Sequence, residues 1–307
     1  MADTHTLMTV HAHPDDETIA TGGIMAKYSR AGDRVICVTC TGGEHGEIVV
    51  PELDTPENHA RLAEIRAEEL RRALARLGPI EHYWLGYVDS GMMGTPENDA
   101  PESLWQANVD EAAGRLVRIV RQTRPEVVVG YNDFGGYGHP DHIRAAQLAK
   151  LAFERAGDSA WYPEQLAAEG LTPWQPLKLY ESVMDMARRE ELSKILKERG
   201  IQSWFVDRDD ETEEERAGRL AHFARMAAAA GPKTAQVDVS DMVENKLAAM
   251  REHVTQIGPD FPFLVLTADE WRAYQPDEEF TLRVSHVPVR IPETDLFAGL
   301  DGSTGPS

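Results

Sequence analysis

The sequence predicts an α/β fold in which helices flank a parallel sheet. Short apolar runs alternate with helix-forming stretches through the first half of the chain, which is the pattern of this fold class. Residues 6–40 form the first such unit, a strand, a helix and a second strand, and a right-handed crossover is expected to join the two strands in parallel. Turns rich in histidine and aspartate follow two of the apolar runs, where the carboxyl ends of parallel strands bind ligands.

The elements of the first half are expected in the following order. Strands are predicted at residues 6–10, 34–40, 82–88 and 126–131, and helices at residues 18–31, 56–77, 108–124 and 143–156. The helices show apolar side chains at helical spacing and end at breakers, such as Gly32 after the first and Gly78-Pro79 after the second. Residues 92–106 are rich in proline, glycine and acidic side chains, so we expect an irregular surface loop there.

After residue 160 the pattern is less regular. Strands are predicted at residues 177–183 and 280–289, and helices at residues 188–199 and 241–254 and in an alanine-rich stretch that ends at Ala230. The acidic run at residues 209–215 is interpreted as the solvated start of that alanine-rich helix. We expect residues 1–165 to form a first domain, residues 166–300 a smaller C-terminal α+β part, and residues 301–307 a disordered tail.

The composition restricts the function classes. Lys+Arg number 31 and Asp+Glu 52 in 307 residues, so the formal net charge is −21, which argues against general binding of nucleic acid or anionic membranes. No stretch approaches the roughly 18 apolar residues of a membrane helix, and no cationic region precedes an apolar block as in a secretory signal. We therefore expect a cytoplasmic protein with a small-molecule substrate, and the sequence leaves its oligomeric state open.

The two cysteines, Cys37 and Cys40, have the spacing of some redox and zinc pairs. They lie in a stretch that reads as a buried strand, and side chains three apart on a strand point to opposite faces. We interpret both as core residues, which agrees with a reducing compartment.

Two turns concentrate the chemically active side chains. The first, His11-Ala12-His13-Pro14-Asp15-Asp16-Glu17, follows the first strand, and the second, residues 135–142, follows the strand at residues 126–131. Four of the 11 histidines lie in these turns, and the two turns would face each other if both strands are parallel in one sheet. So many charged groups in a tight turn require compensation, for which a divalent cation is suited. Five other histidines are interpreted as structural or merely exposed: His5, His59, His82, His222 and His286.

The spacing of these residues predicts a metal site. His13 and Asp16 are three residues apart in one turn, and His142 is the natural third ligand from the other turn. Two imidazoles and one carboxylate leave a fourth position for water, which is the arrangement of a catalytic zinc site. We expect one Zn²⁺ per chain, although Fe²⁺ also suits two histidines and one carboxylate.

The neighbouring residues supply the rest of a hydrolytic site. Asp15 lies beside the ligands without being required as one, so it can act as the base that takes the proton of the water. His139 and Tyr137 are placed to stabilise an oxyanion, and Asp141 is expected to orient a histidine rather than to bind the metal. Together these groups predict hydrolysis of an amide or ester.

The two turns resemble those of a known family. His13-Pro14-Asp15-Asp16-Glu17 together with Gly138-His139-Pro140-Asp141-His142 is similar to the LmbE-like (PIG-L) zinc deacetylases, which act on N-acylated glucosamine conjugates. The similarity covers nearly the whole chain and includes residues 41–44, 87–91 and 252–256. It points to the mycothiol branch, which contains a biosynthetic deacetylase and a detoxifying S-conjugate amidase. Residues 277–299 are more similar to the amidase, which is therefore the preferred prediction.

The resemblance implies roles for individual residues and a fold. It implies a zinc site of the three ligands named above, Asp15 as general base, His139 as oxyanion stabiliser and Tyr137 as a mobile polar group over the site. Arg66 and Asp89 match positions that hold sugar and inositol hydroxyls, and Gln256 lies in a segment that approaches the site from the C-terminal part. The implied fold is a Rossmann-like parallel sheet whose smaller C-terminal part covers the active site.

Several alternatives remain open. Ala20 stands where the amidases have lysine and the deacetylases serine, so the N-acetylglucosaminyl-inositol deacetylase is the second candidate, and an amidase of a natural-product pathway is another. A nucleotide-dependent Rossmann enzyme is disfavoured, because the glycine-rich loop at residues 41–47 lacks the spacing and the lysine of a phosphate loop. A non-catalytic carbohydrate-binding relative is disfavoured, because a binding protein has no use for the base Asp15.

Overall fold

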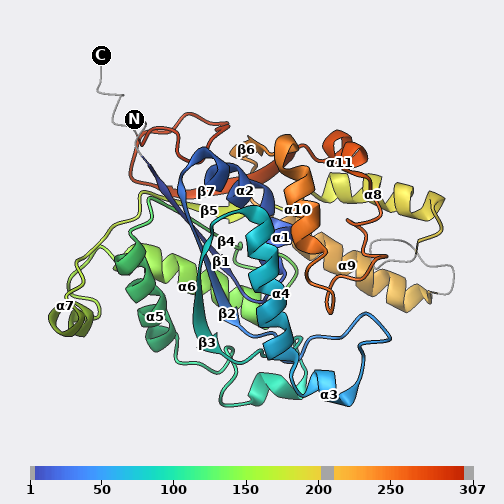
Figure 1. The fold of residues 1–307 in the computed structure, drawn as a ribbon, viewed down its shortest axis with the longest axis horizontal. Coiled ribbons are helices and arrows are strands. Elements are labelled where there is room, and N and C mark those ends of the chain that lie inside the picture. The colour runs from blue at the N-terminus through green and yellow to red at the C-terminus, as the bar shows by residue number, and fades with distance from the viewer. Residues whose placement is uncertain (1–3, 202–210, 301–307) are drawn as a thin grey trace.

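A seven-stranded sheet forms the centre of the molecule (Figure 1), whose structure is a computed structural model that describes residues 4–201 and 211–300. The strands are β1 (Thr6–His11), β2 (Arg34–Thr41), β3 (Glu81–Tyr87), β4 (Val127–Gly130), β5 (Lys178–Ser182), β6 (Ala235–Asp238) and β7 (Asp277–Ser285). Their spatial order is β3-β2-β1-β4-β5-β7-β6. Strands β1 to β5 are parallel, and β7 runs antiparallel to its neighbours β5 and β6. The predicted α/β class with a mainly parallel sheet is confirmed.

Helices cover both faces of this sheet. Helices α5 (Val109–Thr123) and α6 (Pro140–Arg155) pack on one face, and α2 (Gly22–Ala31), α4 (Leu62–Leu77) and α10 (Val243–Met250) lie over the other (Figure 1). Each face buries its own apolar cluster because successive strand side chains alternate between the two faces. Cys37 and Cys40 belong to different clusters, so the prediction that they are core residues on opposite faces is confirmed, and both are free thiols.

Two long helices predicted in the first half are each divided. The stretch at residues 18–31 forms α1 (Asp16–Ala20) and α2, because Thr21 leaves helical geometry with φ −140° and its hydroxyl lies 3.0 Å from His11 Nε2. The backbone N–H groups of Gly23 and Ile24 at the new helix start are satisfied by the distant carboxylate of Glu278.

The stretch at residues 56–77 likewise forms α3 (Pro56–His59) and α4, with a break at Arg61, whose φ is −126°. Helix α6 starts earlier than the predicted residue 143, since Pro140 suits a first helical position. The loop at residues 92–106 contains a short 3₁₀ helix, Pro96–Asp99, and the side chain of Asn98 binds the carbonyls of Ser90 and Met92.

The later elements differ more from the prediction. Strand β7 ends at Ser285, before the predicted residue 289. Helix α10 ends at Met250, before the predicted residue 254, because the residues after Met250 are bound to other parts of the fold. The sequence pattern did not reveal β6, α7 (Pro163–Glu169) or α11 (Ala268–Tyr274). The predicted helices near residues 188–199 and before Ala230 are present as α8 (Met186–Glu198) and α9 (Glu213–Ala229).

The acidic run before α9 has the predicted role where it is described. Thr212 and Glu215 form a capping box at the start of the helix, and the carboxylates of its first turn are exposed. Residues 209 and 210 of this run and the expected tail at residues 301–307 lie outside the described residues.

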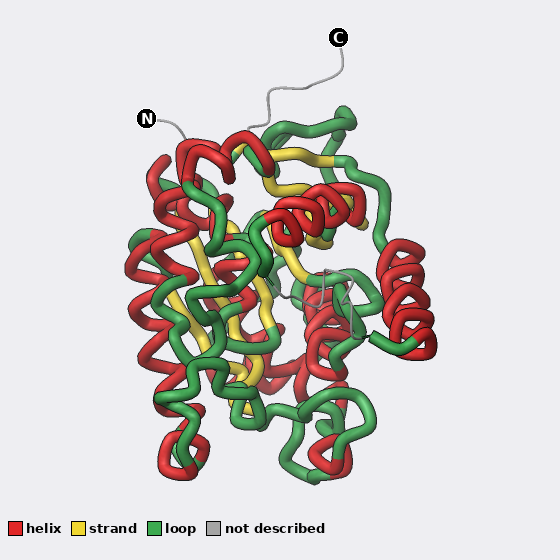
Figure 2. The backbone as a smooth tube through the Cα atoms, turned by 90° about the vertical axis from the view of Figure 1, so that its right-hand side faces the viewer, coloured by secondary structure: helices red, strands yellow, loops and turns green. Residues whose placement is uncertain are grey.

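The C-terminal part continues the same sheet. Strands β5, β7 and β6 extend it beyond β4, and α8, α10 and α11 share a third apolar cluster. Figure 2 shows the strands, in yellow, in the middle of the molecule with helices on both sides. The proposed division at residue 165 stays a prediction. In the described part of the chain, no helix has the length and apolar composition needed to cross a membrane.

Candidate active site

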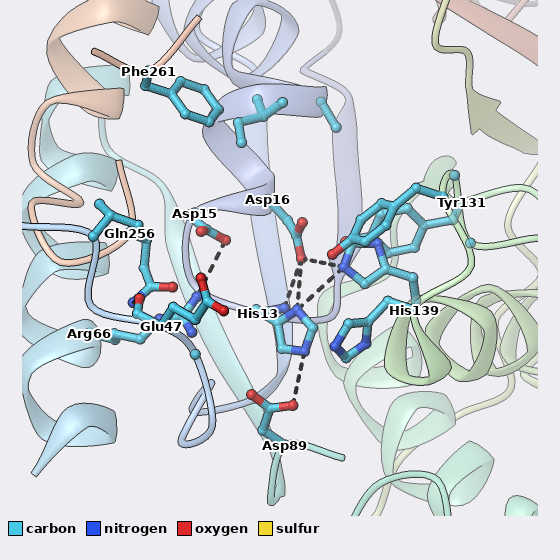
Figure 3. A pocket seen from close by; sticks show the side chains of 18 of the residues that line it. His13, Asp15, Asp16, Glu47, Arg66, Asp89, Tyr131, His139, Gln256 and Phe261 are labelled. Atoms are coloured by element: carbon cyan, nitrogen blue, oxygen red, sulfur yellow. Dashed lines mark hydrogen bonds and ion pairs between the residues drawn. The ribbon is translucent and has the colours of Figure 1, made fainter. Parts of the chain in front are cut away.

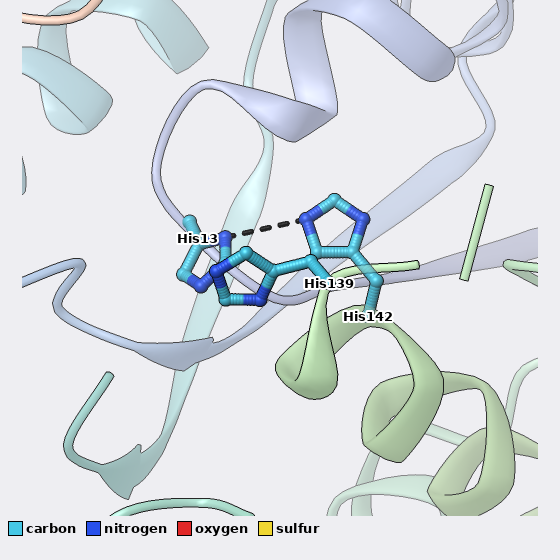
Figure 4. Close-up of side chains that lie close together, drawn as sticks. All are labelled: His13, His139 and His142. Atoms are coloured by element: carbon cyan, nitrogen blue, oxygen red, sulfur yellow. Dashed lines mark hydrogen bonds between the residues drawn. The ribbon is translucent and has the colours of Figure 1, made fainter. Parts of the chain in front are cut away.

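The site lies where the parallel strands end. Strands β1 and β4 are neighbours in the sheet, so the turns that follow them, residues 12–17 and 131–139, face each other as predicted. The rings of His13, His139 and His142 come together from these two turns (Figure 4). The loops after β2 and β3 complete the surroundings of the site.

Three side-chain atoms of the predicted ligands form a small triangle. His13 Nδ1 lies 3.3 Å from His142 Nε2 and 3.6 Å from Asp16 Oδ2, and His142 Nε2 lies 3.4 Å from Asp16 Oδ2. Ligands at about 2.0–2.2 Å from a zinc ion are separated by about 3.3–3.6 Å in a tetrahedron. The triangle therefore has the dimensions of three ligands around one tetrahedral cation.

Other groupings of nearby side chains could also hold a metal ion. Among the described residues, His13, His139 and His142, and also His13, Asp89, His139 and Asp141, could hold a metal ion. We favour the triangle that includes Asp16. The aspartates of the second group, Asp89 and Asp141, face Nε2 of His13, whereas the triangle is formed around its Nδ1. A site for a divalent cation thus fits the residues present.

Buried carboxylates surround the outer nitrogen of His13. Its Nε2 lies 3.1 Å from Asp141 Oδ2 and 3.6 Å from Asp89 Oδ1. Although burial acts in the opposite direction, the carboxylates of Asp89, Asp141 and Asp16 hold the pKa of His13 well above its usual range. An Nε2–H that donates to Asp141 leaves Nδ1 free to bind a cation, which is the common arrangement of a metal-binding histidine.

Asp141 is itself held rigidly. Its side chain is fully buried and accepts hydrogen bonds from the backbone N–H of Ser90, at 2.9 Å, and from the Ser90 hydroxyl. Sequence reasoning did not identify Ser90 as a contributor. The structure places Asp141 against His13, which is the geometry expected of an orienting carboxylate.

Asp15 lies beside the triangle and outside it. Burial raises the pKa of Asp15 to about 6, with Arg66 opposing this shift and the Asp16 carboxylate adding to it. In contrast, although burial opposes ionisation, the charges of His142 and His13 hold the pKa of Asp16 well below its usual range. The two adjacent aspartates therefore differ: Asp16 is ionised as a ligand must be, and Asp15 can exchange a proton near neutral pH.

His139 lies across the site from Asp15 (Figure 3), and Tyr137 lines the same cleft. Burial, with the neighbouring His13 and His142, lowers the pKa of His139 to about 3, so its ring is neutral. His139 Nδ1 accepts the backbone N–H of Asp141 at 3.2 Å, which leaves the proton on Nε2 as a donor. The Tyr137 ring packs against His142, with ring centroids 4.8 Å apart, and lines the same cleft.

The predicted substrate-binding residues have different surroundings. Asp89 lies next to His13, and its carboxylate also accepts the backbone N–H groups of His45 and Gly91. Gln256 lines the cleft and donates from Nε2 to the carbonyl of Glu47 at 3.1 Å. Figure 3 shows Gln256, Glu47 and Arg66 on the same side of the site as Asp15.

Arg66 is 3% exposed, and its guanidinium donates to two backbone carbonyls. Its nearest carboxylate is that of Asp15, at 3.4 Å. The structure thus brings the predicted site residues to one cleft, apart from Asp141, which is buried behind His13. Two of the guanidinium nitrogens of Arg66 donate to the protein backbone.

Three further residues lie near the site: Glu17, which the sequence suggests either orients a histidine or occupies the first turn of a helix, and His253 and Glu69, which were given no role from the sequence. Glu17 and His253 form a buried contact of 2.7 Å between Oε1 and Nε2. Glu69, one turn after Arg66 on α4, binds the backbone N–H of Thr255 at 2.9 Å. The sequence pointed to Glu69 in one way only: it lies three residues after Arg66, so both side chains lie on one face of the helix.

The cleft has a volume of about 1360 Å³, and both polar and apolar residues line it. The loops after β1, β2 and β3 contribute mainly polar residues. Helix α1 and the C-terminal part contribute apolar surface from Ile19, Phe261 and Tyr274 together with charged side chains such as Lys246 and Glu278. In Figure 3 the Phe261 ring lies beyond Asp15 and Asp16 on the side away from Asp89.

This fold and this site define a hydrolytic enzyme of the deacetylase and amidase class, and comparison with known proteins agrees. The chain belongs to the PIG-L family, described as GlcNAc-PI de-N-acetylases, whose pattern matches residues 8–153.

Two relatives and one solved structure illustrate the similarity. The chain is 41% identical to 1D-myo-inositol 2-acetamido-2-deoxy-alpha-D-glucopyranoside deacetylase 1 of Catenulispora acidiphila, over 97% of this chain and 90% of that protein. It is 38% identical to mycothiol S-conjugate amidase of Streptomyces coelicolor, over 98% of this chain and 99% of that protein. The N,N'-diacetylchitobiose deacetylase of Pyrococcus horikoshii shares the fold with a TM-score of 0.61 and 22% identity, covering 92% of this chain and 84% of that chain.

Proposed function

We propose that this protein is a zinc-dependent deacetylase that removes the acetyl group from an N-acetylglucosaminyl-inositol. The observation that carries the proposal is the triangle of His13, Asp16 and His142 with Asp15 beside it. A relative named as such a deacetylase is 41% identical to this chain over nearly its whole length. For this reason we now prefer the deacetylase to the amidase, which residues 277–299 had suggested.

The metal supplies a Lewis acid that polarises the amide carbonyl and makes water a better nucleophile. His13, Asp16 and His142 would hold it, and Asp141 would keep the His13 ring in the required tautomer through its 3.1 Å contact with Nε2. Zinc is favoured over Fe²⁺ by the tetrahedral spacing of the three atoms.

The acid–base steps fall to the chain's own residues. Asp15, with its pKa raised to about 6, accepts the proton of the attacking water and can return it to the departing amine. His139, neutral and protonated on Nε2, donates a hydrogen bond to the oxyanion of the tetrahedral intermediate, and Tyr137 assists from the same side. Asp89 and Gln256 line the cleft, where they would bind sugar and inositol hydroxyls.

An S-conjugate amidase is the second candidate, and one observation favours it. The cleft of about 1360 Å³ is larger than an acetylated sugar-inositol requires, because ligand cavities of about 300–1,000 Å³ hold drug-sized molecules. The apolar side chains of Ile19, Phe261 and Tyr274 would give surface for the substituent of an S-conjugate, the kind of substrate named for the 38% identical relative.

A paired hydrolysis assay on zinc-loaded protein tests these proposals. It compares N-acetylglucosaminyl-inositol with a mycothiol S-conjugate, with Asp15→Ala as the inactive control. Faster release of acetate from the first compound supports the deacetylase, and faster cleavage of the conjugate supports the amidase. If zinc binds but neither compound is cleaved, the proposed substrate class is wrong.

A further inference from the structure

The peptide group that precedes Asp15 has a strained orientation. Asp15 has φ 117° and ψ −34°, a region that residues other than glycine rarely adopt. Such a conformation persists only where surrounding contacts fix it, and it is found mainly at functional sites. Asp15 is the N-cap of α1 but makes no side-chain capping bond, so its carboxylate is available to the cleft that it lines.

Both ends of the Pro14–Asp15 peptide group are held by buried side chains. The Pro14 carbonyl accepts a hydrogen bond from Arg66 Nη2 at 2.5 Å, and the Asp15 N–H donates to Glu17 Oε2 at 2.9 Å. The φ angle of Asp15 is the rotation about its N–Cα bond, between this peptide plane and the Asp15 carbonyl group. That carbonyl is also held, because it accepts backbone N–H groups from the first turn of α1. With both sides of the rotation held, φ is fixed, and with it the direction in which the Asp15 side chain leaves the backbone.

Glu17 is in turn held by a residue from the far end of the chain. Its second oxygen, Oε1, lies 2.7 Å from His253 Nε2, and both side chains are 0% exposed. His253 belongs to the segment that follows α10, so the contact joins residues 236 positions apart. The same segment is held independently by Glu69, whose two oxygens bind the backbone N–H and the hydroxyl of Thr255.

We propose that His253 and Glu17 are positioning residues for Asp15: His253 fixes the Glu17 carboxylate, and Glu17 holds the Asp15 N–H so that the Asp15 carboxylate faces the reacting water. The inference rests on the proposed function in one respect, since it takes Asp15 to be the catalytic base. It links the C-terminal part of the chain to the chemistry without any contact between His253 and the predicted metal ligands.

The test compares variants of the zinc-loaded protein. His253→Leu removes the partner of Glu17 and is expected to lower kcat about 10- to 100-fold with bound zinc unchanged and KM within about twofold. His253→Gln keeps an N–H donor near Glu17 and should restore most of kcat. His253→Leu leaves the buried carboxylate of Glu17 without its charged partner, which could prevent folding. In that case the double variant Glu17→Leu/His253→Leu, which removes both charges, replaces it in the test.

Thr255→Val is the matched control, since it removes a side-chain anchor of the same segment without touching Glu17 or Asp15. The Thr255 hydroxyl also accepts from Gln256 Nε2 at 3.3 Å, so an effect of this variant is expected in KM and not in kcat. The variant should leave kcat near the wild-type value. The combination with Asp15→Ala separates positioning from general damage: His253→Leu should not lower the residual activity of the Asp15→Ala protein further. An equal loss in both backgrounds, loss of zinc, or an equal effect of Thr255→Val would overturn the proposal.

Amide hydrogen exchange gives a readout that does not depend on turnover. A peptide that covers residues 11–20 should exchange faster in His253→Leu than in wild type and Thr255→Val, because the Asp15 N–H loses its fixed acceptor. If the wild-type protein cleaves no tested amide, the proposed function fails. The exchange data would still show whether His253 and Glu17 hold the Asp15 N–H. Unchanged exchange in His253→Leu would refute the positioning role.

Discussion

Two aspartates of the site have different surroundings and therefore different tasks. Asp15 is half-buried beside the cleft, and burial raises its pKa to about 6. Asp141 is fully buried against His13 and Ser90, where its carboxylate orients a ring and has no access to substrate. Environment rather than residue type assigns each role.

For Asp15, replacement by asparagine should abolish the base and leave the metal site intact. We expect kcat to fall by about 10²–10⁴, the usual contribution of a general base, while metal content measured by elemental analysis stays at the wild-type level. Asp99→Asn, at an exposed aspartate in the 3₁₀ helix, should change neither quantity. Loss of metal from Asp15→Asn would show that Asp15 is a ligand instead.

For Asp141, replacement by asparagine should weaken metal binding. The neutral amide no longer stabilises the His13 Nε2–H, so we expect affinity for zinc to fall about 10- to 100-fold in competition with a chelator. Asp133→Asn is the control, because that side chain is 77% exposed and lies after the same strand, β4. Equal affinities of wild type and Asp141→Asn would contradict the orienting role.

Single residues were the most predictable scale. The ligands, the base and the orienting aspartate all lie in two short turns, and the spacing within each turn already limits what their side chains can reach. For Arg66 the sugar contact implied by the resemblance stays a prediction, and the structure adds that its guanidinium donates to the carbonyls of Pro14 and Gly43. Such backbone acceptors carry no signal in the sequence.

At the scale of elements, α4 fastens the C-terminal segment to the first half. Arg66 and Glu69 lie on its buried face, one holding the turn before α1 and the other holding Thr255. Helix α10 ends where this segment begins, which explains why the predicted helix to residue 254 is shorter in the structure. Tertiary hydrogen bonds outweigh helix propensity there.

Replacement of Glu69 by alanine should therefore destabilise the protein. The N–H and hydroxyl of Thr255 lose their acceptor, which costs about 1–3 kcal/mol for each buried group left unsatisfied. We expect a lower midpoint of urea unfolding. Glu68→Ala, at the neighbouring exposed position on the same helix, should leave the midpoint nearly unchanged. Equal midpoints for wild type and Glu69→Ala would mean that the contact is not needed for stability.

For the whole molecule, the cation should stabilise the fold because its ligands come from two distant turns. A metal that binds only the folded state adds about 2.7 kcal/mol when its free concentration is 100 times the dissociation constant. We expect chelation to lower Tm by several degrees and zinc to restore it. His142→Asn should have a Tm that responds little to chelator or zinc, and an undiminished response would argue against the proposed ligand set.

The sequence by itself determined the sheet class and singled out the two turns that carry the proposed site. Apolar runs, breakers and the spacing of His13, Asp16 and His142 are local properties, and parallel strands bring their carboxyl ends to one edge. It also indicated the family through those turns. The helix break at Thr21 and the strand β6 escaped prediction because each depends on partners distant in the chain, Glu278 for the first and β7 for the second. The break at Arg61 was not predicted either.

Only the tertiary structure decided which buried charges meet. Glu17 and His253 are 236 positions apart, and Glu69 and Thr255 are 186 positions apart. Pairing of this kind follows from how the C-terminal segment packs against α1 and α4, and no local pattern encodes it. A buried charge must find a partner wherever the fold supplies one, so the contacts that fix the direction of Asp15 become visible only in the folded chain.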